Sequence, residues 1–141
     1  MQAWLLALEH SGATRLLQTI PGLYPVVSAL HLLGISLLMG PILIVDWALL
    51  RGRTSPWEGL QRIAAAGFAI AAVTGMALFT VQASKYAFNP AFLGKLALIG
   101  LAGANLLAYR WIGRDRPRGF ALCSLTIWLA ALLSGRFIAF L

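Results

Sequence analysis

Charged residues are scarce in this chain. Only 11% of its 141 residues are Asp, Glu, Lys or Arg, whereas 60% are hydrophobic, and the mean hydropathy is +0.84. A soluble domain of this size needs a far more polar surface than that. The composition therefore excludes an ordinary soluble domain and predicts a single membrane-embedded domain over residues 1–141.

Cysteine and the common catalytic motifs are also scarce or missing. The single cysteine, Cys123, excludes an intramolecular disulfide. Two histidines and three methionines are few for a dedicated copper site. The sequence has no glycine-rich phosphate loop, HExxH, Cys-x-x-Cys or nucleophile elbow. We therefore do not expect a hydrolase or a kinase.

What the chain does contain is long apolar runs. A hydrocarbon core needs ~20 helical residues to cross it. The apolar runs predict transmembrane helices at about residues 25–50, 63–81, 92–109 and 120–141, with Pro or Gly in each intervening segment. The predicted fold is an all-α integral membrane four-helix bundle.

The N-terminal segment predicts a short interfacial helix over residues 2–20. It lacks the basic start of a signal peptide, and Glu9 and His10 interrupt its apolar run. From Ser11 onward, apolar residues share one helical side and polar residues, Thr14 among them, share the other. Pro21-Gly22 is expected to end this helix.

The basic residues indicate the orientation. Seven of the eleven lie in or beside two of the connections: Arg51, Arg53, Arg62, Arg110, Arg114, Arg116 and Arg118. By the positive-inside rule both connections are cytoplasmic and both termini are outside, which is the periplasm for a bacterial inner membrane. The net charge of +7 therefore reports topology, and we expect a lipid bilayer and no nucleic acid as partner.

Small residues at four-residue spacing predict close helix packing. One such stripe, Gly67, Ala71 and Gly75, lies on the second predicted span, and another lies on the third, at Gly100, Ala104 and Ala108. Both are expected to be helix contacts.

Three ionisable residues fall in the outer half of the predicted bundle: His31, Lys95 and Arg136. No acid in that half obviously neutralises the two cations. Imidazole binds iron, and Lys or Arg can hold propionates, so the set predicts an anionic ligand such as a b-type haem, with His31 as metal ligand. Two alternatives stay open. Lys95 and Arg136 can snorkel to the headgroups, and His31 can be a hydrogen-bonded structural residue.

Asp46 lies ~22 Å from His31 along the same helix, near its inner end. Arg51, Arg62 and Arg110 are candidates to pair with it, which favours a structural clamp, with a proton relay as the alternative and Asn105 at similar depth. Met76 at mid-depth is either a packed residue or a second axial haem ligand.

Several of these residues carry a resemblance. Tyr24-Pro25, His31, Gly34, Asp46, Asn89-Pro90, Lys95, Asn105 and Arg136 together resemble an uncharacterised bacterial family of small four-span membrane proteins, over nearly the whole chain. The chain departs from that pattern at two positions. Ala48 stands where the family has an arginine, and Tyr109 where it has a histidine.

Two further groups are distantly similar. The haem-binding, oxygen-independent protoporphyrinogen oxidase family is similar in length, in four helices, in a Leu-His pair and in lysines near Lys95 and Arg136. The CopD-type copper-resistance membrane family is similar in a His followed nine residues later by Gly, as at His31 and Gly40.

The leading prediction is therefore a bacterial inner-membrane protein that binds haem or a similar anionic redox ligand, for electron transfer or porphyrin-linked oxidation. The alternative is a structural or accessory subunit without a cofactor, in a homo-oligomer or a larger membrane complex. Transport of copper or a small solute ranks third.

Overall fold

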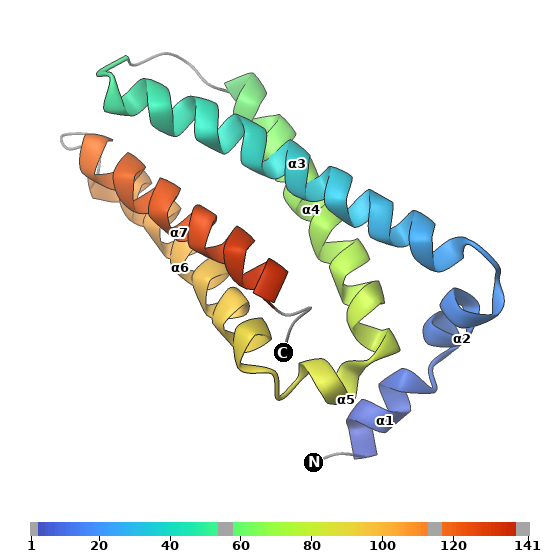
Figure 1. Ribbon diagram of the computed structural model, residues 1–141. Coiled ribbons are helices and arrows are strands. Elements are labelled where there is room, and N and C mark those ends of the chain that lie inside the picture. Colours follow the sequence, from blue (N-terminus) through green and yellow to red (C-terminus); the bar gives the residue numbers. More distant parts are fainter. Residues whose placement is uncertain (1–2, 54–57, 113–116, 138–141) are drawn as a thin grey trace. The chain divides into compact units, whose positions relative to one another are not determined.

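A computed structural model describes residues 3–53, 58–112 and 117–137, without the side chains of Ala13, Arg136 and Phe137. Within these ranges every regular element is a helix (Figure 1). Four are long and apolar enough to cross a membrane: α3 (Leu23–Leu50), α4 (Glu58–Val81), α6 (Pro90–Ile112) and α7 (Pro117–Phe137). The all-α class and the four spans of a multi-pass membrane protein are confirmed.

The N-terminal segment forms two short helices in place of the single helix predicted over residues 2–20. They are α1 (Ala3–Glu9) and α2 (Gly12–Thr19). The break comes at Ser11, whose hydroxyl accepts a hydrogen bond from the Thr14 amide at 3.4 Å and so caps α2. The predicted end at Pro21-Gly22 is found, since Gly22 has a φ of 87° there.

The long helices extend beyond the predicted spans. The apolar run of α4 starts at Ile63, but the helix itself begins at Glu58, and α6 begins at Pro90. Asn89 explains the start of α6, because its side-chain oxygen accepts hydrogen bonds from the amides of Ala91 (2.9 Å) and Phe92 (3.3 Å). Hydropathy marks where a helix is apolar, whereas caps mark where it starts.

The chain divides into two compact units. The first unit is Met1–Leu38 with Arg62–Phe88, and the second is Met39–Gln61 with Asn89–Leu141. α3 contributes to both, and Pro41 stands inside it just after the division. Proline removes one backbone donor from the helix, which transmembrane helices tolerate.

In the first unit, α3 and α4 pack through glycine. A Cβ added at Gly67 would lie 2.5 Å from the Leu38 amide nitrogen and 2.8 Å from the Gly34 carbonyl oxygen. A Cβ at Gly34 would lie 2.7 Å from the Ala71 nitrogen. The two backbones thus touch where only glycine fits, as the first small-residue stripe predicts.

In the second unit, α6 and α7 form an antiparallel hairpin in which they run side by side (Figure 1). Its buried residues include Ala102 on α6, together with Ala121 and Ala131 on α7. The rings of Tyr109 and Phe120 meet at 6.0 Å between centroids. The hairpin is therefore packed by side chains.

The second predicted stripe does not make this contact. Gly100 and Ala104 are exposed, and a Cβ at Gly100 would meet nothing within 4 Å among the atoms that the structure describes. The buried side of α6 is instead the side that carries Ala102. The same motif therefore packs on α4 and faces outward on α6.

Candidate functional site

His31 lies on α3 where that helix contacts α4, in the first unit. Its Nδ1 is 3.1 Å from the Thr74 hydroxyl, and that hydroxyl donates its hydrogen to the Ile70 carbonyl at 2.6 Å. A hydroxyl has one hydrogen, so the Thr74 oxygen accepts from Nδ1. This geometry favours the tautomer with the imidazole hydrogen on Nδ1.

Gly75 makes room for the imidazole ring. A Cβ at this position would lie 2.9 Å from His31 Cε1 and 3.4 Å from Nδ1. The ring therefore packs directly on the α4 backbone, with Thr74 holding its orientation.

Lys95 lies near the start of α6, in the second unit. Its side chain runs along α7, because a Cβ at Gly135 would lie 3.4 Å from Lys95 Nζ and 3.7 Å from Cε. Arg136 is the next residue of α7, and its side chain is outside the described residues. The structure thus brings Lys95 and the α7 backbone at residue 135 together.

His31 belongs to one unit and the two cations belong to the other. The surroundings of His31 are therefore described within the first unit, and those of Lys95 within the second. The grouping of all three residues around one ligand stays a prediction.

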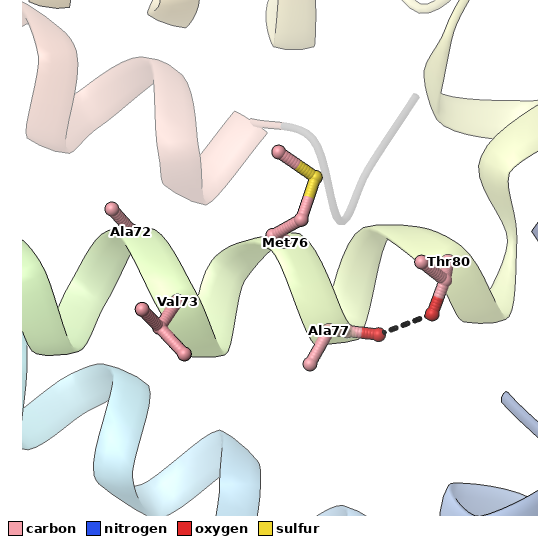
Figure 2. A pocket seen from close by; sticks show the side chains of 5 residues that line it. All are labelled: Ala72, Val73, Met76, Ala77 and Thr80. Carbon is pink, nitrogen blue, oxygen red and sulfur yellow. Dashed lines mark hydrogen bonds between the residues drawn. The ribbon is translucent and has the colours of Figure 1, made fainter. Parts of the chain in front are cut away.

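Met76 points away from His31. It follows Gly75 by one residue, a rotation of about 100° around a helix of 3.6 residues per turn, and its side chain is 66% exposed. Figure 2 shows it among the α4 side chains that line an apolar hollow of about 460 Å³: Ala72, Val73, Met76, Ala77 and Thr80. The role of Met76 as a second axial ligand stays a prediction.

Asp46 is buried in the second unit, with 7% of its surface exposed. Its polar partner is Ser124 on α7. Oδ2 of Asp46 is buried without a hydrogen-bond partner among the described residues. Arg51, a predicted partner in the same unit, lies over the Trp47 ring at 4.8 Å instead. The predicted arginine clamp is therefore not formed by Arg51, since the indole face attracts the guanidinium.

Asn105 joins the two helices of the hairpin through its side chain. Its side-chain nitrogen donates a hydrogen bond to the Phe120 carbonyl at 3.1 Å. The amide thus ties α6 to the first turn of α7. Its described role is structural.

The N-terminal helices attach to the first unit by polar contacts. Thr14, expected on the polar side of its helix, is completely buried, and its hydroxyl lies 3.2 Å from the Thr80 carbonyl and 3.0 Å from that of Leu8. Glu9 accepts hydrogen bonds from the Ser84 hydroxyl (2.6 Å) and amide (2.8 Å). These bonds hold the pKa of the exposed Glu9 carboxyl below its usual range.

Sequence reasoning missed Thr74 and Ser124 because hydroxyls in apolar helices usually bond to their own backbone. Thr74 carried a usable signal, since it lies seven residues after Gly67 and so on the same helical face. Ser124 carried none, because its partner belongs to a helix far away in sequence.

Comparison of the chain with models of protein families, with curated proteins and with solved structures finds no match. Within the part of the chain that the structure describes, no three His, Cys, Asp or Glu residues gather as a metal site.

Proposed function

We propose that this protein binds a b-type haem, or a comparable anionic redox ligand, in the outer half of a bacterial inner membrane. His31 is the metal ligand, and Lys95 and Arg136 are the charge partners. The haem, when bound, supplies one-electron chemistry for electron transfer or a porphyrin-linked oxidation.

The observation that carries this proposal is the hydrogen bond between His31 Nδ1 and Thr74. Histidines that bind metals usually donate their second ring hydrogen to a fixed acceptor, which sets the tautomer and raises the basicity of the ligating nitrogen. Thr74 is such an acceptor, since its own hydrogen is used by Ile70. Gly75 provides the space that keeps the ring in this position.

The charge of the second unit supports the anionic character of the ligand. Lys95 is partly buried beside Gly135 and forms no ion pair with the described residues. Arg136 comes next along α7. Two cations at the same end of the α6–α7 hairpin attract an anion such as a propionate.

Absorption spectroscopy tests the proposal. The protein is purified in mild detergent from cells supplied with haem, and a Soret band that His31→Ala removes is expected. His10→Ala is the matched control, because His10 is exposed and its Nδ1 lies 2.8 Å from the Leu6 carbonyl of the preceding helix α1. An absent Soret band after reconstitution, or a band unchanged in His31→Ala, refutes haem binding through His31.

Thr74→Val tests the orienting contact with little change in size. Loss of such a partner typically weakens metal affinity by about 10–100-fold. We expect the affinity for haem to decrease by about 10–100-fold, while the helix content measured by circular dichroism is unchanged. An unaltered affinity would mean that Thr74 does not support the ligand.

The cations are tested by Lys95→Ala and Arg136→Ala. Each should weaken haem retention without unfolding the helices. Lys85→Ala is the control, since Lys85 lies outside the spans in α5 (Ala83–Tyr86). Unchanged affinity in both test variants would favour snorkelling to the headgroups.

The proposed orientation places both termini in the periplasm, since the arginine-rich connections are expected to be cytoplasmic. A reporter fused after Leu141 should then read periplasmic. A cytoplasmic signal would reverse the depths assigned to His31, Lys95 and Arg136.

An accessory subunit without a cofactor is the second candidate. The observation in its favour is the hollow on α4, whose rim residues Val73 and Met76 are 71% and 66% exposed. A helix of a partner or of a second copy can fill such a hollow. Disulfide trapping through Val73→Cys in a Cys123→Ser background would detect a second copy, and Trp111→Cys is the exposed control.

A further inference from the structure

A carboxyl group lies buried inside the second unit without a countercharge among the residues that the structure describes. Asp46 is on α3, four residues before the end of that helix, and is 7% exposed. Ser124 on α7 is the polar side chain that interacts with the carboxyl. The other oxygen, Oδ2, is buried and has no partner among the residues described.

Two arginines of the same unit contact other groups and not Asp46. Arg51 on α3 lies over the Trp47 ring. Arg118 on α7 lies beside Gly52, where an added Cβ would be 3.1 Å from its Nη2. Neither forms an ion pair with the carboxyl of Asp46.

The other charged and titratable groups that the structure describes on α6 and α7 are exposed, contact other residues or lie far along the helix from Asp46. Arg110 is exposed, and the Tyr109 ring packs against Phe120. Lys95 lies at the opposite end of α6, beside Gly135. Cys123, next to Ser124, is exposed. In the described part of this unit, no positive charge neutralises Asp46.

An ionised carboxylate in such a place would be very costly. Desolvating an unpaired charge costs far more than desolvating the neutral acid, so a buried carboxyl without a countercharge takes up a proton. A metal cation is a poor alternative to the proton, because hard cations such as Na⁺, Mg²⁺ and Ca²⁺ need several oxygen ligands. Asp46 and Ser124 supply too few, and no described acidic group stands nearby to complete a shell.

We propose that Asp46 and Ser124 form a proton-binding site within the membrane domain, in which Asp46 carries the proton and Ser124 orients the carboxyl. The step is simple acid–base chemistry: the carboxylate takes up H⁺ as one O–H bond forms, and releases it as that bond breaks. The site is separate from His31 and does not depend on haem binding.

Labelling with the apolar reagent dicyclohexylcarbodiimide tests this site. A protonated carboxyl adds across one N=C bond of the reagent, and the product rearranges to a stable N-acylurea that mass spectrometry locates in a peptide. In detergent-solubilised full-length protein, we expect label at Asp46 that decreases as the pH is raised. Asp46→Asn should lose this label, while Glu9→Gln, which changes an exposed carboxyl, should keep it.

Ser124→Ala separates an orienting role from mere packing. Without the hydroxyl, the charged form of Asp46 loses its interaction with Ser124, so labelling should persist to higher pH. Thr126→Val is the matched control, because its hydroxyl bonds only within α7, to Leu122.

Two results would overturn the proposal. One is the absence of label at Asp46 down to mildly acidic pH in protein whose circular dichroism shows intact helices. The other is protection of Asp46 by Na⁺ at constant ionic strength, which would identify a cation site. Asp46→Asn keeps the side-chain shape, and its helix content and elution volume show whether loss of label reflects loss of fold.

Discussion

The α3–α4 pair and the α6–α7 hairpin use similar residues in different ways. Both helix pairs are antiparallel and rich in glycine and alanine. In the first, Gly34 and Gly67 bring the two backbones into contact, and a Cβ would collide with main-chain atoms at 2.5–2.7 Å. In the second, alanines, an amide and two rings fill the interface. Backbone contact tolerates no added atom, whereas side-chain contact can readjust.

The largest expected effect comes from a larger residue at Gly67. Gly67→Leu should force α3 and α4 apart, because main-chain atoms cannot move aside. We expect the free energy of unfolding to decrease by about 1–3 kcal/mol or more, measured by thermal unfolding in detergent. Gly100→Leu is the matched control, since Gly100 has open space around it, and should change stability by less than about 0.5 kcal/mol. Equal losses in the two variants would erase the contrast between the helix pairs.

A smaller loss of stability is expected when one methyl group is added beside His31 or beside Lys95. Gly75→Ala places a Cβ 2.9 Å from His31 Cε1, so the stiff ring must shift from Thr74. Gly135→Ala places one 3.4 Å from Lys95 Nζ, the end of a flexible chain. We expect about 1 kcal/mol of destabilisation for Gly75→Ala and almost none for Gly135→Ala. Thermal unfolding measures both, and the reverse order would contradict the described packing.

Removing the amide from the hairpin should cost less still. Asn105→Ala breaks the 3.1 Å bond to the Phe120 carbonyl. Hydrogen bonds between membrane helices contribute about 0.6 kcal/mol on average, and we expect a loss of that order in the same unfolding measurement. Ser36→Ala is the control, because its hydroxyl bonds only to Leu32 of its own helix. A loss as large as that of Gly67→Leu would show that the hairpin depends on this one contact.

The smallest effect concerns pH and the N-terminal helices. Ser84 lowers the pKa of Glu9 in the folded protein, so the contact stabilises the fold above the usual pKa of a glutamate. That contribution is lost as the pH falls through the folded pKa. The protection factors for amide exchange in α1, which correct for the pH dependence of the intrinsic rate, should therefore decrease at acidic pH. Glu9→Gln should remove this pH dependence while leaving exchange in α6 unchanged.

The fold class could be predicted from the sequence, because hydropathy over ~20 residues reports the solvent that a helix faces. The same reasoning located the helix break at Pro21-Gly22 and the packing stripe at Gly67. It failed for Gly100, since spacing identifies a helical face without identifying what lies against it. It also placed Thr14 on the polar side, where a tertiary bond to Thr80 buries it.

Sequence alone determined that this is a four-span membrane protein with ionisable groups inside its spans, because composition and period are local properties of the chain. Only the tertiary structure decided how those groups are partnered. It placed the His31 ring on Gly75 and Thr74, Lys95 along Gly135, and Asp46 beside Ser124. Each of these contacts joins residues about 40 or more positions apart, and side-chain partners at such separations depend on helix rotation and register, which no local pattern encodes.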